Sequence, residues 1–254
     1  MTSAVAIRRG FTVHPDAWLA GIIGRPAFRV DSVDAPPSGW NARLKCEDLF
    51  ITAKVGADQV ADASLLQDLG FRTIDTALTF EGSAPAAPAA DSRVRFARAE
   101  DRAAIAELAG SAFVYSRFHL DPAIPAWLAH RVKAAWADNF FAGKRGDGMV
   151  VAEQAGFVVG FLQLLWHPGD VLVIDLIAVA PRSARSGLAR AMIGFAAVTG
   201  VGDARRPRSF RVGTQAANTP SVRLYESLGF RLSEAQFVLH HHGRGAPYLP
   251  KAAT

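Results

Sequence analysis

The stretch VIDLIAVAPRSARSGLARAMIGFA, residues 173–196, decides the fold of this chain. Its first half is a nearly continuous apolar run, which predicts a buried strand ending just before Pro181. Ser186 and Gly187 then open a segment whose apolar residues recur at helical spacing. The first turn of such a helix presents amide hydrogens without intrahelical partners and the positive end of the helix dipole. The stretch therefore predicts a strand, a basic loop and a helix N-terminus that can hold a pyrophosphate, although a plain turn would use similar residues.

Strands and helices alternate on both sides of this stretch. We predict strands over residues 93–99, 149–154, 156–166, 170–180, 209–215 and 231–241, and helices over 100–113, 186–200 and 220–230, the last of them stopped by Gly229. Pro122 and Pro125 open a further helical region that runs through residues 127–141. This alternation predicts an α/β or α+β fold with helices on both faces of one sheet.

The segment EGSAPAAPAADS, residues 81–92, is the clearest break in the pattern. Its small residues and prolines show no apolar periodicity, which is typical of an extended linker. We therefore predict a small N-terminal α/β domain over residues 1–82, a linker over 83–92 and a larger domain over 93–254.

A faint internal similarity links the two predicted domains. LLQDLGFRTIDTALTF, residues 65–80, resembles LYESLGFRLSEAQFVL, residues 224–239, as a helix end, a glycine and a strand. This is a common local unit, so chance reuse explains it as well as a degenerate copy of the last half of the larger domain. In such a copy Leu66 takes the position of Tyr225 and lacks its hydroxyl.

Composition narrows the class of protein. Half of the 254 residues are hydrophobic, so the chain can bury a core. No apolar run reaches the roughly 18 residues that span a bilayer, and two arginines near the N-terminus argue against a signal peptide. The single cysteine, Cys46, cannot form an internal disulfide or a cysteine zinc site. We expect a soluble cytoplasmic protein with no membrane partner.

The charge balance favours an anionic partner such as nucleic acid, a membrane surface or a phosphorylated small molecule. There are 28 Lys and Arg against 23 Asp and Glu, a net charge of +5. The densest basic cluster, ARRPRSFR at residues 204–211, has no interleaved stacking aromatics, so we expect no nucleic acid partner. We also expect no metal, because consecutive strand residues such as His240, His241 and His242 point to alternate faces.

The loop from Ala184 to Ala189 resembles the acyl-CoA-binding motif of the GCN5-related N-acetyltransferases (GNAT), usually Gln/Arg-x-x-Gly-x-Gly/Ala. Gly187 and Ala189 fit its second half. Ala184 stands where Gln or Arg is usual, so that Arg182 or Arg185 would have to supply the charge.

A second segment, NTPSVRLYESLGF at residues 218–230, is similar to another signature of that family, Asn-x-x-Ala/Ser-x-x-x-Tyr-x-x-x-Gly-Phe. The two signatures occur in the family's order, and the resemblance covers roughly residues 93–242. It implies the GNAT fold, a central mixed and mostly antiparallel sheet with helices on both faces.

The resemblance also implies a reaction. Acetyl-CoA would be the co-substrate and a primary amine the acceptor, and the pantetheine arm would lie in a gap between the strands at 170–180 and 209–215. Tyr225 would protonate the leaving thiolate, since a tyrosine with a pKa near 10 stays protonated at pH 7, although a core tyrosine fits the same pattern. Asp175 would orient or deprotonate the amine. The implied cofactor-binding residues are Ile177, Ala178, Val179, Arg185, Ser186, Gly187, Leu188, Ala189, Arg190 and Asn218, the last of which could instead cap its helix.

A narrower resemblance concerns the acceptor. RVGTQAANTPSVRLYESLGF, residues 211–230, and SRFHLDPAIP, residues 116–125, are similar to segments of two-domain N-acetyltransferases that act on nucleotide-linked amino sugars. It implies that the acceptor meets Arg117, His119, Asp121 and Gln215. A loop that approaches a helix and is capped by Asp121 explains three of these residues equally well. Another small amine, a peptide N-terminus or a non-catalytic acyl-CoA-binding role stay open as alternatives, as does a homodimer.

Overall fold

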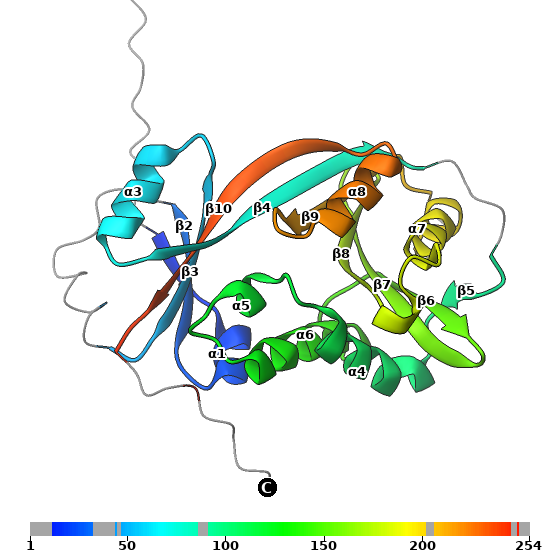
Figure 1. Ribbon diagram of the computed structural model, residues 1–254, viewed down its shortest axis with the longest axis horizontal. Coiled ribbons are helices and arrows are strands. Elements are labelled where there is room, and N and C mark those ends of the chain that lie inside the picture. The colour runs from blue at the N-terminus through cyan, green and yellow to red at the C-terminus, as the bar shows by residue number, and fades with distance from the viewer. Residues whose placement is uncertain are drawn as a thin grey trace, which may run out of the picture. The chain divides into compact units, whose positions relative to one another are not determined.

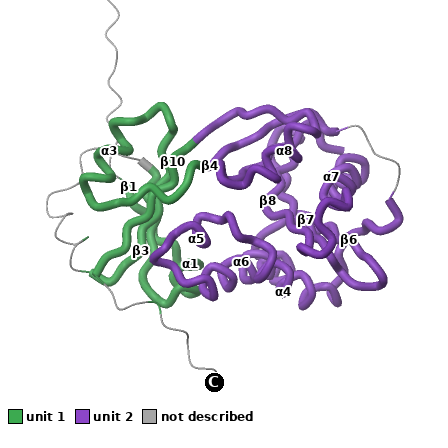
Figure 2. Tube along the Cα trace, in the orientation of Figure 1, with its two compact units in different colours: residues 1–76, 236–254 green, residues 77–235 purple. Residues whose placement is uncertain are grey.

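The computed structural model describes residues 12–32, 44, 47–85, 91–201, 206–244 and 248. It divides the chain into two compact units (Figure 2). The smaller unit comprises residues 1–76 and 236–254, and the larger unit comprises residues 77–235. Cys46 lies outside the described residues. No helix in the described ranges is long and apolar enough to cross a membrane.

The larger unit is a six-stranded sheet with helices on both faces (Figure 1). Its order is β4-β9-β8-β7-β6-β5, with α4 and α6 on one face and α7 on the other. The strands are β4 (Arg72–Ser83), β5 (Val94–Phe96), β6 (Gly148–Gln154), β7 (Phe157–His167), β8 (Val171–Val179) and β9 (Ser209–Gln215). The helices are α4 (Arg102–Ala112), α5 (Arg117–Leu120), α6 (Ala126–Phe141), α7 (Leu188–Thr199) and α8 (Thr219–Ser227), with 3-10 turns η1 (Ala99–Asp101) and η2 (Pro181–Ser183).

This architecture confirms the predicted fold class. The sheet is mixed, because β8 and β9 run parallel while the other pairs are antiparallel. Every second residue of β8, from Leu172 to Ala178, is buried, and the side chains of α7 pack on the same hydrophobic core. The strongly apolar strand and the amphipathic helix that follows it therefore form the centre of the unit.

The smaller unit contains four strands and has its own hydrophobic core. Its strands are ordered β1-β2-β3-β10, where β1 is Thr12–Pro15, β2 is Ala27–Ser32, β3 is Phe50–Gly56 and β10 is Arg231–His242. Helices α1 (Ala17–Ile23) and α3 (Val60–Asp68) belong to this unit. Its core, which includes Ile51, Leu66 and Leu239, is a cluster separate from that of the larger unit.

The internal similarity predicted from the sequence has a structural counterpart. Segments β3–α3–β4 and β9–α8–β10 each consist of a 7-residue strand, a 9-residue helix and a 12-residue strand. Both helices are followed by a glycine with positive φ, Gly70 at 90° and Gly229 at 83°. The amide of Phe71 donates to the carbonyl of Leu66 over 3.0 Å, and Phe230 repeats this bond to Tyr225 over 3.0 Å.

The two segments exchange their closing strands. β3 pairs antiparallel with β10, from Gly56 opposite Gln236 to Phe50 opposite His242. β9 pairs antiparallel with β4 in the matching register, from Gln215 opposite Ala77 to Ser209 opposite Ser83. Each strand that precedes a repeated helix is therefore completed by the strand that follows the other repeated helix.

This exchange explains why the units differ from the predicted domains. The predicted boundary at residue 82 falls within β4, and residues 236–242, predicted in the larger domain, pair with β3 of the smaller unit. Residues 81–83, at the start of the proline-rich segment 81–92, form strand because they pair with residues 209–211 of β9, where Glu81 and Arg211 also make an ion pair of 2.6 Å. Residues 86–90 of the predicted linker lie outside the described residues.

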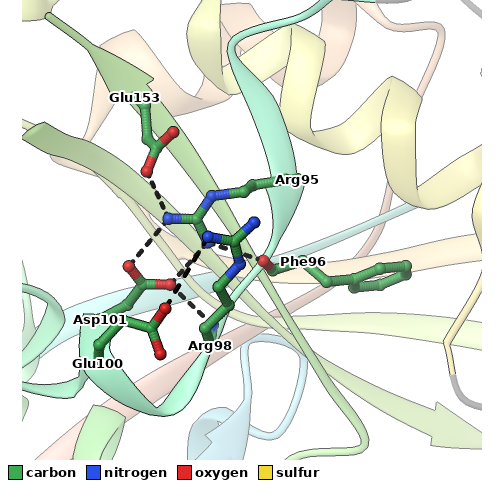
Figure 3. Close-up of polar contacts among 6 residues, drawn as sticks. All are labelled: Arg95, Phe96, Arg98, Glu100, Asp101 and Glu153. Carbon is green, nitrogen blue, oxygen red and sulfur yellow. Dashed lines mark hydrogen bonds and ion pairs between the residues drawn. The ribbon is translucent and has the colours of Figure 1, made fainter. Parts of the chain in front are cut away.

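An ion-pair cluster fastens edge strand β5 to the start of α4 (Figure 3). The Arg95 guanidinium donates to both Asp101 oxygens, at 2.7 and 3.0 Å, and to Glu153 on β6. The backbone amide of Arg98 donates to the same Asp101 carboxylate over 2.7 Å. The side chain of Asp101 is only 6% exposed, and its bonds to Arg95 hold the pKa of the carboxyl below its usual value.

Replacing Arg95 with methionine should lower the free energy of unfolding by about 2–3 kcal/mol, because a buried carboxylate loses its charged donors. The Asp101 pKa is depressed in the folded state, so this stabilisation is present above the unfolded pKa near 4 and is lost as the pH falls through the folded value. The difference in unfolding free energy between wild type and Arg95→Met should therefore be constant above about pH 5 and shrink as the pH falls below about 4 in urea denaturation. Arg98→Met is the matched control, since Arg98 and Glu100 are both exposed and 3.8 Å apart.

Candidate active site

Strands β8 and β9 run side by side only over their first halves. Their parallel pairing extends from Val171 opposite Ser209 to Ile174 opposite Val212. Beyond that point β8 continues along β7 as far as Val179, while β9 continues along β4 as far as Gln215. The two strands therefore part in the middle of the sheet, which is the separation that the sequence resemblance implies.

A β-bulge lies at the point of separation. On the other side of β8, Gln163 is opposite Leu176 and Leu164 is opposite Ile174, which leaves Asp175 as an extra residue. Bulges redirect side chains and are frequent beside active sites. The bulge brings Asp175 to the position where β8 loses β9 as a neighbour.

The Asp175 carboxylate is held by a set of donors. Arg145 donates to both oxygens, at 2.6 and 2.7 Å, and Trp136 Nε1 donates over 2.9 Å. Gln163 Nε2 adds a longer bond of 3.3 Å. Because the side chain of Asp175 is 6% exposed and both oxygens already accept bonds, it is well suited to orienting neighbouring groups and poorly placed to take a proton.

Lys133 lies one turn before Trp136 on the inner face of α6. It is buried, and its ammonium sits 4.7 Å from the ring centre of Phe113 and 4.8 Å from that of Trp136. Burial and the nearby Arg117 guanidinium lower the pKa of Lys133 to about 8, while Asp175 acts in the opposite direction.

A chain of polar side chains links α5 to the same face of α6. Ser116 Oγ is 2.6 Å from His119 Nδ1, and His119 Nε2 is 3.1 Å from His130 Nδ1. Burial, reinforced by the charges of His130 and Lys133, lowers the pKa of His119 to about 4. Both ring nitrogens of His119 are thus engaged within the protein, and the imidazole is neutral at pH 7.

The remaining residues predicted to face the acceptor have different surroundings. Asp121 is 2% exposed and accepts a hydrogen bond of 2.9 Å from the backbone amide of Ala123. This bond caps the turn that leads into α6. The Arg117 guanidinium lies 4.8 Å from the ring centre of Phe118. Gln215 ends β9, and its carbonyl accepts the amide of Asn218 over 2.9 Å.

The segment before α7 has the backbone of an exposed anion cradle. Arg185 and Gly187 both adopt positive φ, at 61° and 80°. A Cβ on Gly187 would meet nothing within 4 Å, so the space in front of the helix is open. The first intrahelical bond runs from Ala191 to Gly187 over 2.9 Å, which leaves the amides of the preceding first turn without intrahelical acceptors. Arg190 donates to Ser227 Oγ over 2.6 Å and so ties α7 to α8.

Tyr225 is a buried member of the core of the larger unit. It is 2% exposed, and its ring is stacked 6.2 Å from Phe230 with 9° between the planes. Burial raises the pKa of the Tyr225 hydroxyl above its ordinary value, and a hydrogen bond with Ser221 opposes this change. The hydroxyl therefore carries its proton at neutral pH. Asn218 accepts the amide of Ser221 over 3.3 Å and caps α8.

Sequence reasoning did not single out the lysine and its neighbours on α6. The signal was present, because Lys133 falls on the apolar stripe that Ala129, Val132 and Ala137 define at helical spacing. A lysine at such a position has to be buried. The partners of Asp175 had no comparable signal, since Trp136 and Arg145 reach it through tertiary contacts.

Comparison with known families agrees with this geometry. The profile of the Acetyltransferase (GNAT) family matches residues 104–230, half of the chain. The chain belongs to this family. The matched region begins in α4 and ends directly after α8, so it includes the strand separation, the bulge and the start of α7.

Two relatives have names that concern sugar biosynthesis. The spore coat polysaccharide biosynthesis protein SpsD of Bacillus subtilis is 31% identical over 143 residues, which are 55% of this chain and 47% of the relative. The dTDP-fucosamine acetyltransferase of Escherichia coli is 26% identical over 191 residues, 75% of this chain and 80% of the relative. The match to the first of these spans about half of that protein's length.

Solved structures share the fold at low identity. A GCN5-related N-acetyltransferase from Kribbella flavida superposes with a TM-score of 0.56 at 15% identity, covering 94% of this chain and 90% of that one. A tandem GNAT protein from the clavulanic acid biosynthesis pathway gives 0.56 at 14% identity, covering 88% and 77%. At this identity the likeness concerns the fold alone.

Proposed function

We propose that this protein is an N-acetyltransferase that moves an acetyl group from acetyl-CoA to a primary amine of a nucleotide-linked amino sugar. The observation that carries the proposal is the parting of β8 from β9 directly before the open N-terminus of α7. An extended acyl-CoA has an anionic pyrophosphate toward one end and a thioester at the other. The open N-terminus of α7 suits the pyrophosphate, and the gap between β8 and β9 suits the arm that carries the thioester.

The cofactor would lie along β8 and its loop. Residues 185–190 would hold the pyrophosphate through first-turn amides and the charge of Arg185. The backbone of Ile177, Ala178 and Val179, which β9 does not pair, would bond the pantetheine arm. Arg190, which is hydrogen-bonded to Ser227, would contribute positive charge near the pyrophosphate. Asn218, which caps α8, would contact the cofactor.

The reaction would be a direct attack of the amine on the thioester. Backbone amides beside the strand gap would stabilise the tetrahedral oxyanion. Tyr225 would give its proton to the leaving thiolate, a role that its protonated state at neutral pH permits. Asp175, held by Arg145 and Trp136, would orient the amine.

The sugar acceptor is supported by the two relatives and by the loop between α4 and α6. A nucleoside diphosphate needs cations, and Arg117 lies in that loop close enough to Lys133 to lower its pKa. His119, Asp121 and Gln215 would shape the acceptor site around it. The single cysteine in the sequence suits a cytoplasmic location, where acetyl-CoA would be drawn from the cellular pool.

The proposal is tested first by measuring acetyl-CoA binding and then by measuring turnover. Calorimetric titration with acetyl-CoA comes first, followed by a thiol-release assay over dTDP-fucosamine, other nucleotide amino sugars, polyamines and peptides. Thiol release with a nucleotide amino sugar supports the full proposal. Release only with another amine would retain the activity and overturn the acceptor, whereas binding without release would indicate an acyl-CoA-binding protein.

Replacing Arg117 with alanine should raise the KM for a nucleotide amino sugar at least tenfold, because a charge-assisted bond to the diphosphate is worth about 1.5–3 kcal/mol. The KM for acetyl-CoA should stay nearly constant, and the wild-type KM for the sugar should rise with salt as exposed charges are screened. Steady-state kinetics of both substrates measure this. Arg117→Lys keeps the charge without the planar fork and should give an intermediate KM. Unchanged kinetics of Arg117→Ala would make the loop structural and remove the support for a diphosphate acceptor.

A further inference from the structure

Lys133 is a buried cation to which the proposed reaction has given no role. Lys133 is 9% exposed, and its ammonium lies over two aromatic rings, those of Phe113 and Trp136. Within the part of the chain that the structure describes, Lys133 makes no hydrogen bond or ion pair. An ammonium buried without an acceptor is costly, and it is therefore an unusual choice for a purely structural position.

The lysine lies where the reactive end of acetyl-CoA would arrive. This step rests on the proposed function. With the pyrophosphate at Gly187, the pantetheine arm runs back along Val179 and Ile177 toward Asp175, the bulge at which β8 and β9 part. Trp136 donates to Asp175 over 2.9 Å, and its ring centre is 4.8 Å from the nitrogen of Lys133. One indole ring thus separates the lysine from the carboxylate beside the thioester.

We propose that Lys133 is the base that removes a proton from the acceptor amine before attack. A primary amine arrives largely as an ammonium ion, which has no lone pair. Asp175 does not suit this task, since Arg145, Trp136 and Gln163 already donate to its oxygens. Lys133 has a free lone pair whenever it is neutral, and no group in the described protein competes for it.

The steps balance in protons and bonds. One N–H bond of the ammonium breaks and an N–H bond forms on Lys133. The neutral amine then bonds to the carbonyl carbon and the C–S bond breaks. The sulfur takes the proton of Tyr225, and the surplus proton of the new amide nitrogen restores the tyrosine. Lys133 afterwards releases its proton to solvent, so that one proton leaves per turnover.

Burial and the charged groups around Lys133 bring its pKa closer to neutral pH than that of an ordinary lysine. Arg117 and His119 on α5 and Asp175 on β8 interact electrostatically with Lys133, and the Arg145 guanidinium lies 5.4 Å from the ring centre of Trp136. His130 lies one turn earlier on α6 itself. Burial and Arg117 outweigh Asp175 and lower the pKa of Lys133 to about 8, so that about one molecule in ten is neutral at pH 7. Catalytic bases work best with a pKa near the working pH.

The test compares Lys133→Met with wild type across pH, using acetyl-CoA with dTDP-fucosamine or the panel amine of highest turnover. Methionine keeps the unbranched shape and removes the buried charge, so the variant should fold. At pH 7 its kcat/KM should fall about 10²-fold or more, and the loss should shrink as the pH rises past the pKa of the amine, which then needs no base. Lys144→Met, which removes an exposed lysine, is the matched control and should behave as wild type.

Lys133→Arg separates a base from an anchoring charge. Arginine keeps the cation but does not accept a proton, so it should fail to restore the rate. Restoration by arginine, or a loss in Lys133→Met that is constant from pH 7 to pH 10, would overturn the assignment while leaving the acetyltransferase in place. A wild-type protein without thiol release would overturn the proposed function and this inference together.

A second measurement is independent of turnover. In protein labelled with ¹³C at the lysine ε-carbon, the signal that disappears in Lys133→Met should titrate near pH 8, well below the ordinary lysine value of about 10.4. An ordinary value would contradict Lys133 as the base even in an active enzyme.

Discussion

Replacing Tyr225 with phenylalanine should lower the turnover number about 10²- to 10⁴-fold, because the leaving thiolate would lose its proposed proton donor. The substitution removes one hydroxyl from a ring that is stacked on Phe230 and buried in the core, so packing should be preserved. Rapid-quench or steady-state thiol release measures the loss, and the affinity for acetyl-CoA should barely change.

Tyr248→Phe is the matched control for this substitution. It also removes a single hydroxyl, one that lies 3.2 Å from His242 in the smaller unit, and it should leave turnover unaltered. If Tyr225→Phe loses less than tenfold, the hydroxyl serves packing and its bond with Ser221, and another group protonates the thiolate.

Replacing Gly187 with glutamate should abolish the rise in melting temperature that acetyl-CoA is expected to cause by binding the folded state. The new side chain would place bulk and negative charge in the open space before α7, where the pyrophosphate would bind. Differential scanning fluorimetry with and without acetyl-CoA measures the effect. Full stabilisation of a folded Gly187→Glu protein would disprove the assignment of this helix terminus.

Gly187→Glu also strains the backbone, because Gly187 has a φ of 80°, which residues other than glycine rarely adopt. This strain needs its own control. Gly143→Glu provides it. Gly143 also has positive φ, at 64°, and also faces open space, but it follows α6 and lies outside the loop before α7. This variant should lose a similar amount of intrinsic stability and keep the response to acetyl-CoA.

The elements of the larger unit could be predicted because their signals are local. Period-two burial marks β8, and a glycine in the left-handed region ends α8 at the position expected from the sequence. The pairing of β3 with β10 could not be predicted in this way. Nothing within either strand specifies a partner so distant in the chain.

The candidate site shows the same division. The start of α7 and the position of Tyr225 follow from short motifs that fold locally. The placement of Asp175 in the site could not be predicted, because it depends on the bulge. The bulge in turn depends on the register between two strands, β7 and β8. Lys133 could have been recognised as a charge on an apolar helix face, but its neighbours depend on how α6 packs on the sheet.

The exchange of closing strands also sets an order for folding during synthesis. When β9 leaves the ribosome its partner β4 has already been made, so the sheet of the larger unit can close at once. β3, made much earlier, must wait until residues 236–242 of β10 emerge. Until then one edge of β3 offers unpaired amides and carbonyls, and exposed edges of this kind recruit other strands. The ladder of β3 with β10, whose first strand is translated early, is thus among the last to be completed, and the nascent chain is most prone to aggregation while β3 lacks this partner.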